Sequence, residues 1–207
     1  MDFISIVISI PAVLIAITAH EFDHGLAAHL LGDPTPSREG RLSLNPLAHL
    51  DPLGTLMLLV AHFGWAKPVQ INPNYFKGNR QRGLFIVSVA GPASNMILAL
   101  LTAIIYNLFD VPMYLALFLF LLVSINIYLA LFNLIPVPPL DGSKILLGLL
   151  PYKTHQYIYR IEPYGPIILI ILILTNITGR VLMPVAGAII SGIFYLGSFI
   201  ANAGGLI

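Results

Sequence analysis

The chain has 207 residues, of which 57% are hydrophobic and only 9% are charged. Soluble domains usually carry about 25% charged residues, so this composition excludes a soluble globular fold and predicts an all-α polytopic membrane protein. The formal net charge of +1 and the absence of cysteine also argue against nucleic-acid binding and exclude disulfides and thiolate metal sites.

The first apolar run covers residues 3–31 and predicts a helix long enough to cross a bilayer with a tail beyond it. Two prolines follow directly at Pro34 and Pro36 and end the helix. Residues 53–65 are apolar but short for a span, and residues 66–73 combine prolines with alternating Val, Gln and Ile. We therefore interpret 53–73 as a segment that enters the membrane and returns, with a short extended, β-like element in its second part.

Further apolar segments follow in chain order at about 84–108, 113–135, 145–150, 164–178 and 182–203. A Pro-rich break at 136–142 separates the first two from the rest. The sequence thus predicts about five or six transmembrane or re-entrant segments. They are expected to form one domain, 1–207, with a core at 3–150 and C-terminal helices at 164–203.

Nearly all basic residues share one side of the membrane if 53–65 is re-entrant, and only Arg180 then lies on the opposite side. The positive-inside rule makes the basic side cytoplasmic, so the N-terminus is expected outside. If 53–65 spanned the membrane, Arg38 and Arg41 would be separated from the others. The residues predicted on the cytoplasmic side are Arg38, Arg41, Lys67, Lys77, Arg80, Arg82, Lys144, Lys153 and Arg160.

Residues His20-Glu21-Phe22-Asp23-His24 match the pattern H-E-x-x-H. On a helix, two histidines four residues apart share one face and can bind one zinc ion, while the glutamate lies beside them as a general base. The alternative is a polar patch that faces a wet cavity or lies beyond the hydrocarbon. Four ionisable groups within five residues are costly in a membrane unless they are compensated.

A catalytic zinc also needs a third protein ligand. Asp141 is the best candidate, because it lies in an apolar stretch between Pro138-Pro139 and Gly142. Non-helical backbone at membrane depth is tolerated where it lines a site. The alternative is that Asp141 caps a helix over 143–150 at the interface.

These segments resemble the site-2 protease family of intramembrane zinc metalloproteases. The resemblance covers most of residues 10–165 and includes features of the compact branch, which lacks PDZ and CBS domains. The matching segments are His20-Glu21-x-x-His24, Asn45-Pro46-Leu47, Gly64-Trp65-Ala66-Lys67-Pro68, Gly91-Pro92-Ala93-Ser94-Asn95, Phe132-Asn133-Leu134-Ile135-Pro136 and Pro139-Leu140-Asp141-Gly142.

The resemblance implies one zinc ion per chain, held by His20, His24 and Asp141, with Glu21 as general base and no other cofactor. It also implies that Asn133 contacts the scissile peptide and stabilises the oxyanion. The alternative for Asn133 is an interhelical hydrogen bond.

The implied activity is hydrolysis of peptide bonds within or beside transmembrane segments of membrane proteins. The active site is expected nearer the cytoplasmic side of a cell membrane. Residues 66–73 could pair with the substrate as an added strand, and a separate membrane partner could regulate access. Asn95 either supports the site or packs between helices.

Asp23 departs from the family pattern, which usually has a small residue there. It lies about 60° from His20 around the helix, and could orient His20, block the open metal position or face a Lys-bearing segment. Two other functions stay open. The chain could be a transporter or cation-binding channel, or an inactive relative that binds transmembrane segments without cutting them. The histidines outside the motif are interpreted as interfacial or loop residues: His29, His49 and His62.

Overall fold

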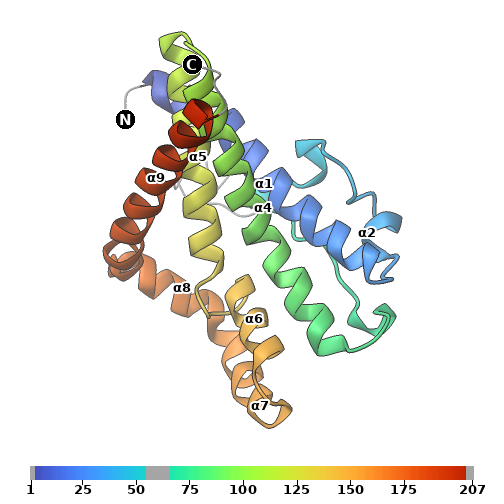
Figure 1. The fold of residues 1–207 in the computed structure, drawn as a ribbon. Helices are drawn as coiled ribbons and strands as arrows, with labels where there is room; N and C mark the ends of the chain where they lie inside the picture. Colours follow the sequence, from blue (N-terminus) through green and yellow to red (C-terminus); the bar gives the residue numbers. More distant parts are fainter. Residues whose placement is uncertain (1–2, 55–65, 204–207) are drawn as a thin grey trace.

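The computed structural model describes residues 3–54 and 66–203 (Figure 1). Most of these residues are helical, and the described ranges contain no β-sheet beyond an isolated antiparallel bridge between Leu50 and Ala66. Within these two ranges, five stretches are long and apolar enough to cross a membrane: Ile4–Leu30, Arg80–Leu108, Met113–Asn133, Tyr152–Leu174 and Ile177–Asn202. The predicted all-α polytopic fold is confirmed, and the chain is a multi-pass membrane protein.

The helices follow the predicted segments closely in the first two thirds of the chain. In order they are α1 (Phe3–Leu30), α2 (Thr35–Arg38), η1 (Pro46–Ala48), η2 (Pro73–Tyr75), α4 (Arg80–Leu108), α5 (Met113–Asn133), α6 (Asp141–Leu149), α7 (Tyr152–Ile161), η3 (Glu162–Tyr164), α8 (Gly165–Leu174) and α9 (Ile177–Ala203). Asp141 is the first residue of α6, and the capping position belongs to Leu140. Asp141 is therefore not the N-cap that the alternative reading expected.

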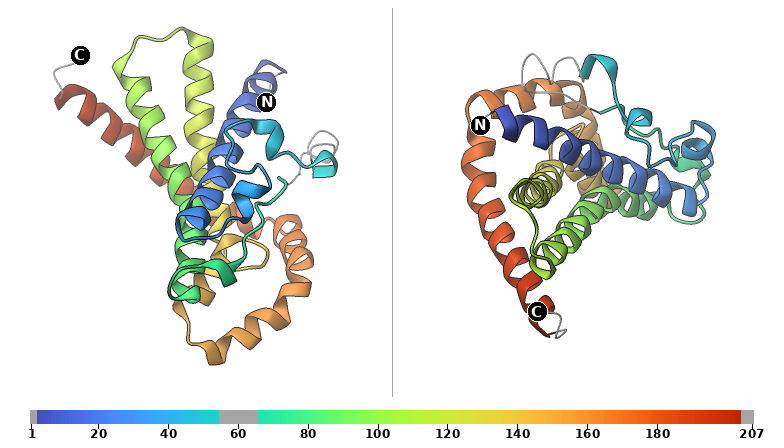
Figure 2. Two further views of the ribbon diagram at one scale, coloured as in Figure 1. Left: turned by 90° about the vertical axis from the view of Figure 1, so that its right-hand side faces the viewer. Right: turned by 90° about the horizontal axis from the view of Figure 1, so that it is seen from above.

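Helix α4 is the centre of the molecule and contacts α1, α5, α6 and α9 (Figures 1 and 2). Small residues allow these helices to approach closely, as is usual where helices pack inside a membrane. The fully buried residues of this core are Ala99, Ala103, Val123, Ile127 and Ala186.

Helix α9 runs in the same direction as α4. Ala186 packs in the cluster with Ala99, and a Cβ on Gly197, further along α9, would lie 3.0 Å from the carbonyl oxygen of Ala103. Later residues of one helix thus meet later residues of the other. The start of α1, the end of α9 and the turn between α4 and α5 accordingly lie toward one end of the molecule (Figure 1).

This direction changes the expected path of the C-terminal third. Helix α8 has 10 residues, which is about 15 Å, whereas the hydrocarbon core is about 30 Å thick. Helix α9 starts with Arg180 in its first turn and runs toward the end where α4 finishes. The predicted crossing at 164–178 therefore cannot be made by α8 alone, although Tyr152–Leu174 and Ile177–Asn202 are each long and apolar enough to span a membrane. The direction of α9 does not support the placement of Arg180 opposite the other basic residues.

The segment from Ala66 to Asn72 is non-helical and is held at both ends. The buried guanidinium of Arg41 donates hydrogen bonds to the carbonyl oxygens of Ala48, Lys67 and Pro68. At the other end, the buried carboxylate of Asp33 accepts one from the N–H of Asn72. The predicted re-entrant part, including His62, lies largely outside the described residues, which omit 55–65.

Candidate metal centre

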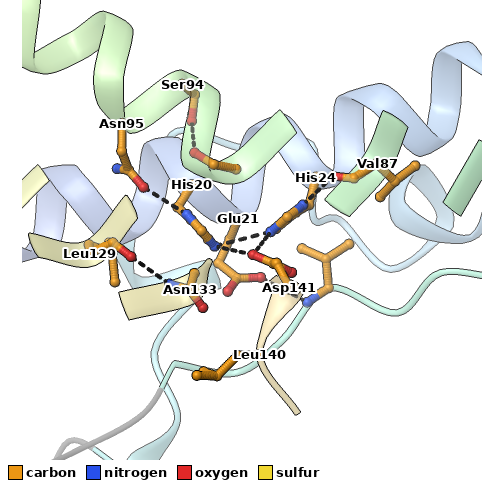
Figure 3. A network of polar contacts seen from close by, with 12 residues as sticks. His20, Glu21, His24, Val87, Ser94, Asn95, Leu129, Asn133, Leu140 and Asp141 are labelled. Carbon is orange, nitrogen blue, oxygen red and sulfur yellow. Dashed lines mark hydrogen bonds and ion pairs between the residues drawn. The ribbon is translucent and has the colours of Figure 1, made fainter. Parts of the chain in front are cut away.

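Three buried side chains meet at one point between α1 and α6 (Figure 3). His20 and His24 lie one turn apart on α1, and their Nε2 atoms are 3.0 Å apart. Oδ2 of Asp141 lies 3.2 Å from Nε2 of His20 and 3.1 Å from Nε2 of His24. The structure thus brings together the three residues that the sequence singles out as ligands, from positions 117 residues apart in the chain.

A chain of amides fixes the orientation of the His20 ring. Asn126 donates through Nδ2 to the carbonyl oxygen of Leu122, so its Oδ1 accepts from Nδ2 of Asn95 at 2.7 Å. Nδ2 of Asn95 also donates to the carbonyl oxygen of Ala16. The remaining Oδ1 of Asn95 lies 2.7 Å from Nδ1 of His20 and must accept from it. Nδ1 of His20 therefore carries a proton, and in the neutral ring Nε2 has a free lone pair.

The His24 ring is held in the same way by the backbone of α4. Its Nδ1 lies 2.7 Å from the carbonyl oxygen of Val87, and since a carbonyl only accepts, Nδ1 is the donor. When both rings are neutral, the Nε2 lone pairs of His20 and His24 and Oδ2 of Asp141 point toward one another. No proton then lies between these three atoms to form a hydrogen bond. Such a set favours a cation, and two histidines with one carboxylate are a usual donor set for a catalytic zinc.

The Asp141 carboxylate is in the form that a metal ligand needs. Burial alone would raise its pKa, but in the absence of a metal a cationic His20 or His24 ring carries a proton on Nε2 that hydrogen-bonds to this carboxylate, and this outweighs burial and holds the pKa of Asp141 far below its usual range. Asp141 is therefore ionised at neutral pH, and metal ligands must be deprotonated.

Two glycines allow the helices to approach this closely. A Cβ on Gly91 of α4 would lie 2.7 Å from Cε1 of both His20 and His24. A Cβ on Gly142 would lie 2.6 Å from the backbone carbon of Ile135. Any side chain at either position would displace one of the elements that carry the three converging residues.

Glu21 lies beside the three residues and is not one of them. Its Oε2 accepts a hydrogen bond from the backbone N–H of Val69 at 3.0 Å. A cavity of about 100 Å³ lies among Glu21, His20, His24, Asn133, Asp141 and the 68–71 segment, which is roomy enough for water. The carboxylate of Glu21 is thus held at the wall of a small polar space.

Asn133 borders this small cavity from the last turn of α5. Its Nδ2 donates to the carbonyl oxygen of Leu129 at 3.0 Å, within the same helix. The interhelical hydrogen bond that was the alternative for Asn133 is absent from the described structure. The amide therefore faces the space beside His20 and Glu21 without being used to join two helices.

Asp23 takes none of the three roles expected for it. Asn95, and not Asp23, holds Nδ1 of His20, and Asp23 is outside the set of converging ligand atoms. It lines a separate groove between α1 and α4, and within residues 3–54 and 66–203 no hydrogen bond or ion pair reaches its carboxylate. The site geometry gives no reason to regard Asp23 as blocking the metal position.

Of the histidines that the structure describes, His29, His49 and His155 lie outside this centre. His29 is exposed at the end of α1, and His49 is buried in the loop before the bridge, where its Nε2 donates to the carbonyl oxygen of Ser43. Sequence reasoning missed Val69, Val87 and Lys144, which also border the small cavity. The first two act through backbone atoms, which leave no signal in the sequence.

Comparisons with known proteins point to one family. Residues 111–176 match the model of Peptidase family M50. The chain is 39% identical over 184 residues to "Putative zinc metalloprotease YwhC" of Bacillus subtilis, covering 84% of each chain. It is 30% identical over 175 residues to "Putative zinc metalloprotease Rip2" of Mycolicibacterium smegmatis, covering 81% of this chain and 66% of that protein. No solved structure matches the chain significantly.

Proposed function

The chain belongs to peptidase family M50, the site-2 proteases, and on that premise we propose that it is a zinc endopeptidase that cuts within or near transmembrane segments. The observation that carries the proposal is the convergence of His20, His24 and Asp141 with Glu21 at their side. We assign the activity to one domain spanning residues 1–207.

The residues present fit a zinc ion, because their buried donor atoms converge and lack a proton to share. Atoms 3.0–3.2 Å apart have the spacing of ligands around one ion with bonds of about 2.0–2.1 Å. When bound, zinc supplies a Lewis acid that polarises the scissile carbonyl and makes water more acidic.

Glu21 is the general base in this proposal. One carboxylate oxygen is held by the Val69 N–H, which leaves the other free to accept a proton from the attacking water. Glu21 then returns this proton to the nitrogen of the substrate as the C–N bond breaks, which leaves an amine and a carboxylic acid, and the acid ionises by giving its proton to solvent or to the amine. The Val69 hydrogen bond fixes the carboxylate in place for both transfers.

Asn133 is the amide that stabilises the oxyanion. One N–H of its Nδ2 donates to the carbonyl oxygen of Leu129, and the second N–H can donate to the substrate oxygen when the carbonyl carbon becomes tetrahedral. An uncharged donor that is already in position can stabilise negative charge with little rearrangement.

A larger apolar cavity supports a substrate that comes from the membrane. This cavity of about 440 Å³ shares His20, Glu21 and Asn133 with the small polar one. Its other walls come mainly from α5 and α8: Leu129, Phe132, Leu140, Pro166, Leu169 and Ile170. A transmembrane helix hides its peptide groups in hydrogen bonds, so we expect a locally unwound substrate segment to enter here.

We place the site toward the cytoplasmic side. His20 and His24 lie in the second half of α1, and Asp141 follows α5, toward the end of the bundle where α4 and α7 begin (Figure 1). The first residues of these two helices include Arg80 and Lys153. The positive-inside rule makes this end cytoplasmic.

The test is cleavage of a panel of detergent-solubilised transmembrane substrates, with bound zinc measured in the same samples. Glu21→Gln is expected to lower cleavage by at least about a hundredfold while zinc stays bound, since general base catalysis contributes 10²–10⁴-fold. Asp141→Ala is expected to lose both zinc and cleavage. Matched controls are Glu39→Gln and Asp110→Ala, which change exposed residues outside the site.

Cleavage by Glu21→Gln at the wild-type rate, or wild-type protein without zinc, would refute the proposal. Metal flux through vesicles that depends on His20, His24 and Asp141 but involves no cleavage would favour a cation transporter. Bound zinc and captured substrate without product would favour an inactive relative.

A further inference from the structure

A groove separate from the two cavities described above lies on the side of α1 opposite Glu21. It is a groove of about 550 Å³ between α1 and α4. On a helix, residues two apart point about 160° from each other, so Asp23 faces away from Glu21. The residues of α1 in the groove recur at helical spacing from Ala19 to Leu30, and those of α4 do so from Ala90 to Leu101. The groove therefore follows both helices and is separate from the candidate metal centre.

The floor of the groove is made of small residues, which brings the backbones of α1 and α4 close to its surface. The small residues are Ala19, Ala27, Ala90, Ala93 and Ser94, and the rims carry exposed Leu30, Ile97 and Leu101. A groove with small residues at its base and larger residues at its edges allows another helix to pack closely in a membrane. Exposed apolar side chains alone would not show this, because lipid covers them in any membrane protein.

One charged group lies in this apolar groove. Asp23 is half-buried, and no described residue donates a hydrogen bond to its carboxylate or forms an ion pair with it. Ser94, the other polar lining residue, donates its hydroxyl to the carbonyl oxygen of Gly91 and is satisfied. A carboxylate within a membrane helix is costly unless a cation compensates it. Among residues 3–54 and 66–203 this carboxylate has no cationic partner, and a Lys or Arg of a second membrane protein would compensate it.

From the groove and its unpaired carboxylate together, we propose that the α1–α4 groove binds the transmembrane helix of a separate membrane protein that carries a Lys or Arg near its cytoplasmic end. Transmembrane helices commonly carry such residues at that end, and Asp23 lies in the half of α1 nearer it. Because the groove faces away from Glu21, the helix bound there is a partner and not the peptide being cut.

The absence of cysteine from the chain allows a direct test by disulfide crosslinking. Ala93→Cys places a unique thiol in the groove, and Tyr128→Cys, on an exposed face of α5, is the matched control. The full chain is reconstituted in phosphatidylcholine vesicles, whose headgroup has no N–H donor. The probe is a synthetic helix of about 20 Leu and Ala residues with one central cysteine and a terminal Lys, compared with the same peptide carrying Gln.

The Lys peptide is expected to crosslink to the Ala93→Cys protein about tenfold more than the Gln peptide. Asp23→Asn should reduce this yield to that of the Tyr128→Cys control, and Asp23→Lys should restore it for a peptide carrying Glu. Size-exclusion chromatography in detergent checks that each variant is folded, and Asp23 does not contact the three converging residues. The crosslinking yield does not depend on peptide hydrolysis. A negative crosslinking result is therefore distinguishable from the absence of the proposed protease activity.

Equal yields with the Lys and Gln peptides, or unchanged yield in Asp23→Asn, would overturn the proposal. Displacement of the peptide by phosphatidylethanolamine would do so as well, because it would make a lipid amine the occupant. Crosslinked pairs of the Ala93→Cys protein in place of peptide adducts would assign the groove to a second copy of this chain.

Discussion

Asn95 is the residue on which the orientation of His20 depends. It satisfies three neighbours at once, the ring of His20, the amide of Asn126 and the backbone of Ala16. It has no exposed surface, so water cannot replace a lost partner. A histidine that binds metal is usually oriented by such a hydrogen bond through its other ring nitrogen.

Replacing Asn95 with Leu is expected to weaken zinc binding by about tenfold to a hundredfold, which is the usual effect of losing such a partner. The His20 ring would lose its acceptor and turn away from Asp141. Competition with a chelating dye measures the affinity. Asn107→Leu is the matched control, because Asn107 lies in the same helix and donates only within it, to Ala103. Equal affinities for the two variants would contradict this role.

At the scale of single residues, the side chains of the site could be predicted from the sequence, whereas the backbone groups that contact them could not. The spacing of His20 and His24 correctly indicates a shared helix face, although their role as ligands stays a prediction. The N–H of Val69 and the carbonyl of Val87 could not be predicted, since every residue has these groups. Asn126 offered a signal, because an amide in the apolar run 113–135 needs a partner.

At the scale of elements, the segment from Ala66 to Asn72 connects the loop region to the site. Arg41 and Asp33 fix its two ends, and between them the Val69 N–H reaches Glu21. This segment forms few backbone hydrogen bonds of its own, because it pairs through a single bridge at Leu50. The position of the Glu21 carboxylate therefore depends on side chains that lie outside the cavity.

Arg41→Gln is expected to lower substrate cleavage about tenfold while zinc content stays unchanged. The substitution removes charge-assisted hydrogen bonds worth about 1.5–3 kcal/mol each, so the segment and its Val69 donor become less well held. Faster amide hydrogen exchange in residues 66–72 would report the cause. Arg38→Gln, at an exposed arginine of α2, is expected to behave as wild type, and a loss of zinc in Arg41→Gln would contradict this account.

The boundaries of the helices were largely predictable from the sequence, but the directions in which the helices run through the molecule were not. Hydrophobic length located α1, α4 and α5 within a few residues. For 164–203 the same criterion predicted two crossings, and the structure has two stretches long enough to cross, Tyr152–Leu174 and Ile177–Asn202. The first of them is divided into α7, η3 and the short α8. Apolar length says how far a helix can reach, whereas the packing of Gly197 on α4 decides where it goes.

For the whole molecule, the parallel course of α4 and α9 predicts which loops share a side of the membrane. Single cysteines at Asp110 and Asn202 should react together with a membrane-impermeant maleimide in intact cells. Cysteines at Asn79 and Lys153 should react only after lysis, because they lie at the basic end. The absence of native cysteine gives a clean background. Labelling of Asn202→Cys only after lysis would contradict the packing of α9.

The candidate centre also has a consequence for the stability of the fold. His24 and Asp141 belong to the first helix and to α6, 117 residues apart, so an ion held between them closes a long loop of the chain. A ligand that binds only the folded state stabilises it by about 4 kcal/mol at a thousand times its Kd. Thermal unfolding in detergent is therefore expected to shift to higher temperature with added zinc in the wild type and to stay constant in Asp141→Ala. A chelator would then act as a mild denaturant of this bundle, separating α1 from α6 as well as stopping the reaction.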